Sequence, residues 1–191
     1  MSDHSAAPTL SIDKIITKKK WKKIENELNH QKQSTDFFIC HLTWNTGLRI
    51  SEITNLKWSD INHDEKYLKI REGKGNKDRC VYFGKKVSTL FKNLKKYHPP
   101  KNHHSYLFIS KKKSKFSRVQ IHRRFKEILR QSKLSSNLSF HSLRHGYATR
   151  MLNEGIHLHE LKTQLGHNSI STTAIYLHFT EESRRKFDRI C

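Results

Sequence analysis

The chain has few cysteines and no long apolar run. Among 191 residues, Cys40, Cys80 and Cys191 lie far apart and form no C-x-x-C pair. An odd, scattered set excludes a disulfide framework and favours a reducing compartment. No apolar segment approaches membrane-spanning length, and Met1 to Leu10 has no apolar signal core. These absences predict a cytoplasmic protein without a membrane partner.

Acidic residues are scarce as well. There are 17 Asp and Glu against 38 Lys and Arg, which gives a formal net charge of +21. Structural ion pairing requires no such imbalance, whereas a field of this sign attracts polyanions. The composition therefore favours a nucleic acid as partner and, with the expected compartment, association with the nucleoid. The alternatives are a basic protein that binds no nucleic acid and a ribosome-associated one.

Several motifs of common enzyme classes are missing. The segment GKGNKD at Gly73–Asp78 lacks the spacing of a phosphate-binding P-loop, and no G-x-S-x-G elbow occurs. His141 and His145 have the spacing of a zinc-binding pair, but Ser142 stands where a zinc protease has glutamate, and no third ligand stands out. The sequence predicts no metal and no cofactor.

Apolar periodicity predicts one mainly helical unit with a small antiparallel β-hairpin, an α+β fold. Residues 1–9 are expected to be a disordered lead-in, residues 10–180 the folded domain and residues 181–191 a tail helix. Strands are predicted at Tyr67–Ile70, at Cys80–Phe83 and, as an edge strand, at Tyr106–Ile109. The predicted helices are Lys18–Leu28, Asp36–Thr46, Leu48–Trp58, Lys86–Tyr97, Ser117 to about Ser132, His141–Asn153, His157–Leu165 and Thr172–His178.

Cations cluster in three places that are candidates for contact with double-stranded DNA. A stiff hairpin can insert a basic side chain into a groove, and a helix rich in outward cations can lie along a duplex. Such runs are also common as solvated surfaces. The candidates are Lys77 and Arg79 of the hairpin, Lys111, Lys112 and Lys113 of a loop, and Arg118, Arg123 and Arg124 of the following helix.

The segment from Ser139 to Thr180 combines arginine, histidine and tyrosine. Arg144, His167 and Tyr176 together meet the needs of phosphodiester transfer without a metal. Arginine binds the non-bridging oxygens, histidine moves protons, and a phenol with cationic neighbours can attack and form a covalent phosphotyrosine. Arg49 can join them from upstream, although taken alone its position favours a surface salt bridge with Glu52.

Four motifs in the same order resemble those of the tyrosine recombinases, the phage-integrase and Xer-like family. They are TGLRISE at residues 46–52, GKGNKDR at 73–79, HSLRHGYAT at 141–149 and LGHNSISTTAIYLH at 165–178. The similarity covers the chain from about Leu10 to its end. It implies the catalytic-domain fold of that family.

The resemblance also implies roles for the site residues. Arg49 and Arg144 would clamp the scissile phosphate, and His167 would donate a hydrogen bond to it. Tyr176 would be the nucleophile and form a 3′-phosphotyrosyl intermediate.

Two further residues would move protons. Lys74 would protonate the 5′-hydroxyl leaving group, with Lys77 as the alternative lysine, and His141 would assist acid–base chemistry. Glu52 would be a supporting residue.

Family members usually carry a helical DNA-binding domain before the catalytic one, yet only about 45 residues precede Arg49. The expectation is therefore a minimal recombinase or a truncated remnant, with weaker and more salt-sensitive site recognition. In the family a C-terminal helix docks into a neighbouring subunit, which implies a homotetramer on synapsed DNA. A helix folded back on its own domain is the alternative for residues 181–191.

The sequence thus predicts a site-specific recombinase that performs integration, excision or inversion. The alternatives are a catalytically silent DNA-binding regulator derived from a truncated integrase, and a topoisomerase that uses similar chemistry.

Overall fold

The computed structural model describes residues 10–71, 78–110 and 114–180. Its helices are α1 (Lys18–Asn29), α2 (Thr35–Thr46), α3 (Ile50–Asn55), α4 (Lys85–Tyr97), α5 (Arg118–Gln131), α6 (Phe140–Asn153), α7 (Leu158–Leu165) and α8 (Ser171–Ala174). Strands β1 (Ile61–Asn62), β2 (Tyr67–Ile70) and β3 (Arg79–Tyr82) form an antiparallel sheet in the order β1-β2-β3. The mainly helical α+β prediction is confirmed.

Short polar side chains begin three of the longer helices, as the sequence predicts. Thr17 accepts a hydrogen bond from the Lys20 amide at the start of α1, and Ser34 accepts one from Phe37 at the start of α2. Ser117 forms a capping box with Gln120 at the start of α5. These caps satisfy backbone N–H groups that have no partner within the helix.

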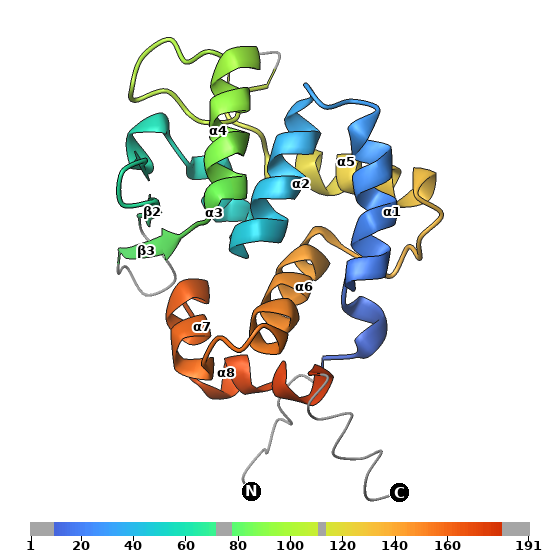
Figure 1. The fold of residues 1–191 in the computed structure, drawn as a ribbon. Coiled ribbons are helices and arrows are strands. Elements are labelled where there is room, and N and C mark those ends of the chain that lie inside the picture. Colours follow the sequence, from blue (N-terminus) through green and yellow to red (C-terminus); the bar gives the residue numbers. More distant parts are fainter. Residues whose placement is uncertain (1–9, 72–77, 111–113, 181–191) are drawn as a thin grey trace, which may run out of the picture.

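Helix α2 is the centre of the main core. It packs against α1, α4, α5 and α6, and buried side chains lie all around it (Figure 1). A second, smaller apolar cluster lies between α6, α7 and the segment after α8, and includes Tyr147, Leu161, Leu165 and Tyr176. Helix α7 also packs beside β3. The small cluster therefore joins the C-terminal motifs to the sheet.

Three predicted elements differ from the structure. Helix α3 spans only Ile50–Asn55, because the backbone is extended at Arg49 and at Leu56. Tyr106–Ile109 forms isolated bridges to Lys57 and Lys115 and not a sheet strand. The predicted helix around Tyr176 divides into α8 and a 3-10 turn at Leu177–Phe179. The hairpin tip with Lys74 and Lys77, the loop with Lys111, Lys112 and Lys113, and the predicted lead-in and tail lie outside the described residues.

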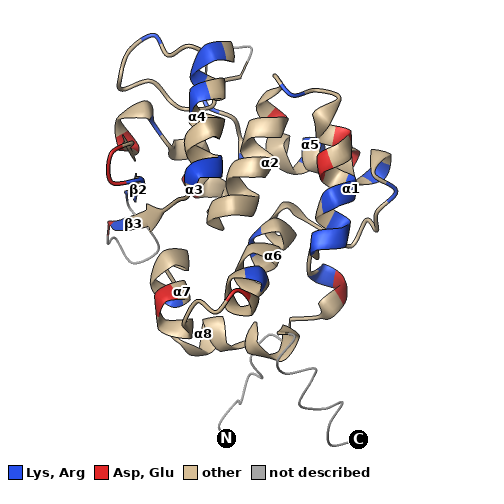
Figure 2. Cartoon of the chain, viewed as in Figure 1, with Lys and Arg blue, Asp and Glu red and all other residues tan. Residues whose placement is uncertain are grey.

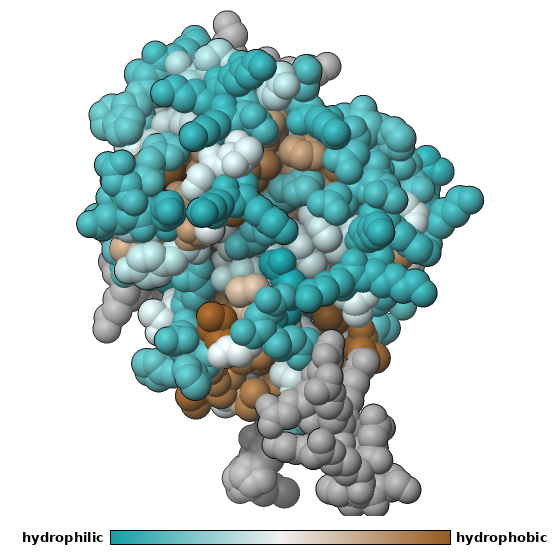
Figure 3. Space-filling model, viewed as in Figure 1, coloured by the Kyte–Doolittle hydropathy of each residue, from teal (hydrophilic) through white to brown (hydrophobic). Residues whose placement is uncertain are grey.

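Positive charge is distributed over much of the described surface. Lysine and arginine segments mark α1 and α4, with fewer acidic segments between them (Figure 2). The same face is mostly hydrophilic, and its hydrophobic residues gather at the lower left, over α7 and α8 (Figure 3). In the described parts of the chain, no helix is long and apolar enough to cross a membrane.

Candidate active site

Arg144 anchors the site from the middle of α6. Only 1% of the residue is exposed. Its Nη1 donates to the carbonyl oxygen of Gly47 at 2.7 Å, and its Nη2 donates to that of Leu165, also at 2.7 Å. Its Nε is buried without a partner. Arg144 thus joins the end of α2 to the end of α7, and it forms no ion pair with any described residue.

Arg49 approaches from the N-terminus of α3. Its Nη1 pairs with Oε1 of Glu52 at 2.9 Å, while the backbone N–H of Arg49 donates to Oε2 of the same carboxylate. Its Nη2 donates to the carbonyl oxygen of Gly166 at 2.9 Å. The salt bridge with Glu52 and a place in the site are therefore not alternatives, since Arg49 has both.

Arg79 is the third guanidinium of the cluster. It begins β3, pairs with Oε1 of Glu52 through Nη1 at 2.9 Å, and directs Nε toward the carbonyl oxygen of Gln164 at 3.4 Å. Only 11% of its side chain is exposed. The sequence makes Arg79 a candidate for contact with DNA, and in the structure its side chain is turned into this cluster.

The end of α7 is where the three arginines meet. Three consecutive carbonyl groups, those of Gln164, Leu165 and Gly166, accept from Arg79, Arg144 and Arg49 respectively. The last carbonyls of a helix lack partners within it and carry the negative end of the helix dipole. The end of α7 can therefore hold several guanidinium groups through its backbone carbonyl groups, without an acidic side chain of its own beside them.

Positive charge exceeds negative charge in this cluster. Among the described residues, Arg49, Arg79 and Arg144 face one carboxylate, Glu52, whose side chain is 7% exposed. Burial raises the pKa of Glu52, but the hydrogen bond and charge of Arg79, with the Arg49 amide, lower it overall, so Glu52 stays ionised. Burial and nearby Arg49 lower the pKa of Arg144 to about 10. A buried excess of cations is costly without an anion, so the cluster is suited to bind one.

Tyr176 lies between α8 and the final 3-10 turn and is buried, with 1% of the residue exposed. Its hydroxyl is 2.9 Å from Nδ1 of His145. Burial raises the pKa of the phenol, although Arg144 and Arg49 act in the opposite direction. The phenol is therefore protonated at neutral pH, and the tautomer of His145 decides which of the two groups donates their hydrogen bond.

Two further histidines surround the phenol. The His167 ring lies nearly parallel to that of Tyr176, with centroids 6.4 Å apart, and its Nδ1 is 2.8 Å from the hydroxyl of Thr173. The His141 ring meets that of His145 edge-on at 4.5 Å. The left-handed backbone of Gly166, with φ of 66°, turns the chain so that His167 follows the end of α7 directly.

These histidines are neutral at pH 7. Burial and the charge of Arg144 lower the pKa of His141 to about 4. Burial and the neighbouring cationic and histidine groups lower those of His145 and His167 to about 3. Each ring can therefore accept a hydrogen bond or a proton, and each would be easier to protonate beside a bound anion.

The structure brings five of the six predicted catalytic residues into one region, namely Arg49, His141, Arg144, His167 and Tyr176. The sixth, Lys74, lies outside the described residues. Arg118 and Arg123 are exposed on α5, and contact with DNA stays a prediction for both. Arg124 instead pairs with Asp36 at 2.8 Å and lies over the ring of Phe116, so part of its function is to hold α5 to α2.

Sequence reasoning assigned no role to three contacts. These are the hydrogen bond between His145 and Tyr176, the ion pair by which Arg79 shares Glu52 with Arg49, and the hydrogen bond between His167 and Thr173. The position of His145 one turn after His141 was a usable signal. No local pattern connects Arg79 to Glu52.

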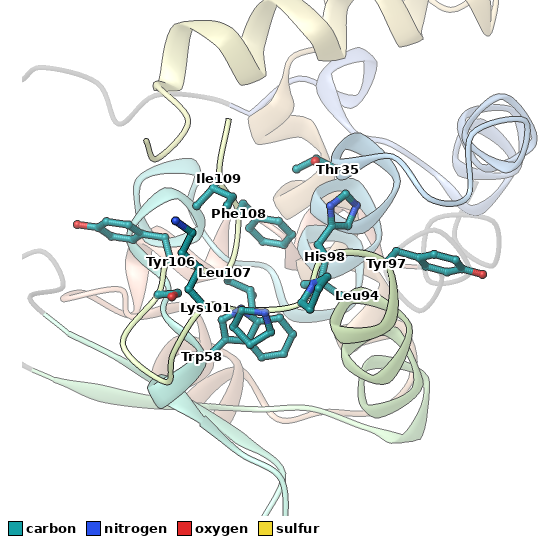
Figure 4. A pocket seen from close by; sticks show the side chains of 13 residues that line it. Thr35, Trp58, Leu94, Tyr97, His98, Lys101, Tyr106, Leu107, Phe108 and Ile109 are labelled. Carbon is teal, nitrogen blue, oxygen red and sulfur yellow. The ribbon is translucent and has the colours of Figure 1, made fainter. Parts of the chain in front are cut away.

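A cavity of about 420 Å³ lies away from this cluster. Trp58, Leu94, Tyr97, His98 and Phe108 are among the side chains that line it, beside the loop after α4 (Figure 4). It contains none of the candidate site residues. Among the described residues, no group of three or more His, Cys, Asp or Glu side chains is placed to hold a metal ion.

Solved structures identify the class of the fold as the catalytic domain of tyrosine recombinases. A XerA recombinase matches 95% of this chain and 65% of its own, with a TM-score of 0.78 and 26% identity. A XerH site-specific recombinase bound to its palindromic difH substrate matches 94% of this chain and 54% of its own, with a TM-score of 0.77. At 22% identity, the second likeness concerns the fold alone.

Sequence comparison then gives the family. Residues 14–183 match the phage integrase family, and the chain belongs to it. A tyrosine recombinase of Thermosipho africanus is 35% identical over 165 residues, and tyrosine recombinase XerA of Pyrococcus furiosus is 36% identical over 173 residues. The matches cover 86% and 89% of this chain, and 55% and 59% of the length of these relatives.

Proposed function

We propose that the chain is the catalytic part of a site-specific DNA recombinase that cuts and rejoins a strand through Tyr176. The observation that carries this proposal is the cluster itself. It holds the buried phenol of Tyr176 beside a buried arginine that has no carboxylate partner among the described residues, with neutral histidines around them. Family membership and the relatives named tyrosine recombinase support it.

In the proposed cleavage step the Tyr176 oxygen attacks phosphorus and the bond from phosphorus to the 5′ oxygen breaks. The phenol loses its proton to a neutral histidine, and His145 is the one within hydrogen-bonding distance in the resting structure. The 5′ oxygen gains a proton from Lys74, by the family resemblance. Rejoining is the reverse attack by a 5′-hydroxyl group, so the energy of the phosphodiester bond is conserved in the phosphotyrosine.

Arg49 and Arg144 bind the non-bridging oxygens in this proposal. Each already uses donors to hold a backbone carbonyl, which fixes the plane of its guanidinium. The remaining N–H groups, including the unpartnered Nε of Arg144, are available to an anion. Fixed donors cost no reorganisation when charge develops on the phosphate, so they stabilise the transition state effectively.

The resting site must open before it can react. Tyr176 and Arg144 are both almost fully buried, so a phosphodiester cannot reach them without local movement. We propose that binding of duplex DNA draws the phenol away from His145 and exposes the arginine. Assembly of a tetramer, with residues 181–191 exchanged between subunits, is a further part of the proposal and rests on the family resemblance.

A catalytically silent DNA-binding regulator is the second candidate. The observation that favours it is the same burial, because a closed site that never opens would leave only the basic surface functional. The presence of Arg49, His141, Arg144, His167 and Tyr176 in one region favours the enzyme.

Covalent trapping tests the proposal and recovers the DNA site in the same experiment. The protein is mixed with sheared genomic DNA from its source organism, denatured, and the DNA attached to it is sequenced. A recovered site is then made as a nicked duplex, from which the cut strand diffuses away and traps the adduct. We expect an adduct with the wild type and none with Tyr176→Phe. Binding without an adduct would support the regulator, and an adduct with Tyr176→Phe would refute the assigned nucleophile.

A further inference from the structure

Arg79 has an arrangement that the proposed reaction does not explain. It begins β3, on the hairpin side of the molecule, but its side chain leaves the sheet and enters the cluster of α3 and α7. If the role of Arg79 were only to face solvent from the strand, its side chain would gain nothing from being buried in this way. The contacts made by this side chain therefore indicate what it does.

The first contact is with Glu52. Oε1 of this carboxylate accepts from Arg79 and from Arg49, each at 2.9 Å, so the two arginines share one oxygen. Oε2 is occupied by the Arg49 backbone amide at 2.7 Å. The carboxylate holds Arg49 through both of its oxygens, and Arg79 holds the same carboxylate through Oε1.

The second contact is with the turn at the end of α7. The Arg79 guanidinium lies so close to Gly166 that an added Cβ atom would be 2.8 Å from its Cζ and Nε atoms. The same Gly166 carbonyl accepts from Arg49, and the next residue is His167. Arg79 therefore packs against the segment that positions both Arg49 and His167, and its own Nη2 is buried without a partner.

We propose that Arg79 is a positioning residue for the phosphate clamp. It touches no reacting atom. It holds Glu52 and the turn at Gly166, and through them it fixes the Arg49 guanidinium in the plane that receives the scissile phosphate. This inference rests on the proposed strand-transfer function and adds a residue to its machinery.

The charge of the scissile phosphate gives the test. Replacing one non-bridging oxygen by a methyl group yields a neutral methylphosphonate, which makes less use of a guanidinium clamp. Arg79→Met keeps much of the apolar stem and removes the guanidinium. On a nicked duplex with the normal phosphate, we expect Arg79→Met to slow single-turnover adduct formation at least tenfold at saturating protein. On the methylphosphonate duplex, we expect the two proteins to differ less than threefold.

Arg71→Met is the matched control. Arg71 directly follows β2 and pairs with a buried carboxylate, Asp60, but its side chain is 56% exposed, and its hydrogen bond and ion pair both go to Asp60 and not to Glu52. We expect adduct rates within twofold of the wild type on both substrates. Equal slowing of Arg79→Met on the two substrates would show a merely structural role and overturn the proposal.

A second measurement does not depend on cleavage. Thermal unfolding of Arg79→Met, Arg49→Met and the double variant, without DNA, reports whether the two arginines are coupled through Glu52. We expect the two shifts in Tm to be clearly non-additive, because neighbours that share a partner do not act independently. Additive shifts would overturn the proposal even if the wild type forms no adduct, whereas a missing wild-type adduct with non-additive shifts would refute only the strand-transfer function.

Discussion

Substitution of Gly166 by alanine should damage the site more than its small size suggests. The residue has φ of 66°, and its missing Cβ leaves the space that the Arg79 guanidinium fills. A left-handed alanine costs roughly 1–2 kcal/mol. The added methyl group must also displace Arg79, which loses a hydrogen bond to a charged partner worth about 1.5–3 kcal/mol. Glu52 keeps its ion pair with Arg49, so this carboxylate is not left as an unpaired buried charge and that full penalty does not apply.

These terms predict that Gly166→Ala lowers the free energy of unfolding by roughly 3–5 kcal/mol. Gly155→Ala is the control, since Gly155 also has positive φ, 89°, but nothing lies within 4 Å of an added Cβ. It should cost only the backbone strain, roughly 1–2 kcal/mol. Urea unfolding at pH 7, followed by tryptophan fluorescence, measures both values.

The decisive comparison places Gly166→Ala in an Arg79→Ala background. There the methyl group meets no guanidinium, so its cost should fall to that of Gly155→Ala. If Gly166→Ala costs the same amount with and without Arg79, the packing of these two residues is not what determines the effect, and the reasoning fails.

Three other outcomes follow from the same contacts. Tyr176→Phe should lose the hydrogen bond to His145 and about 1 kcal/mol of stability, with duplex affinity unchanged within twofold in a gel-shift titration. The depressed pKa values of His145 and His167, about 3 when folded against 6.5 otherwise, mean that the unfolded chain binds more protons below pH 6.5. The free energy of unfolding should therefore fall between pH 7 and pH 5, by about 1 kcal/mol for each partly buried ring. Urea titrations at constant ionic strength measure this change with pH, and His145→Gln should make it smaller. Arg123→Gln should reduce the salt dependence of duplex binding by about one unit of slope, whereas Arg124→Gln should mainly lower Tm, because Arg124 pairs with Asp36. Equal effects of these two variants would contradict the assignment of their surfaces.

The extent of sequence prediction followed the range of the signals. Caps and apolar periodicity are local, so the starts of α1, α2 and α5 and the β2–β3 pairing were predictable within a residue or two. The length of helix α3 was overestimated because its apolar pattern continues through Leu56 and Trp58. Both side chains are buried, but Leu56 lies in extended backbone and Trp58 in a 3-10 helix. Burial alone does not distinguish those conformations from a helix.

The site divides in the same way. The candidate site residues were recognisable by motif, and the structure places Arg49, Arg144 and Tyr176 of these motifs in one region. The direction of each side chain was not recognisable, since Arg79 and Arg124 belong to basic segments that look like surface and yet pair with Glu52 and Asp36. Only the distance between segments remote in sequence decides whether an arginine faces solvent or a carboxylate.

The burial of the two central groups has a consequence for how activity is controlled. Arg144 and Tyr176 head the fully buried side chains of the described residues by volume, although a reaction on DNA needs both of them accessible. Their resting partners are the carbonyl oxygens of Gly47 and Leu165 and the ring of His145, all of them neutral groups. A phosphodiester is a stronger partner for the arginine than a carbonyl group, because a charge-assisted hydrogen bond is roughly twice as strong. Its negative charge also favours protonation of the neighbouring histidines, which a proton-accepting role requires. An anion bound at the cluster would therefore both open the site and raise the basicity of the group that receives the phenol proton in the proposed reaction.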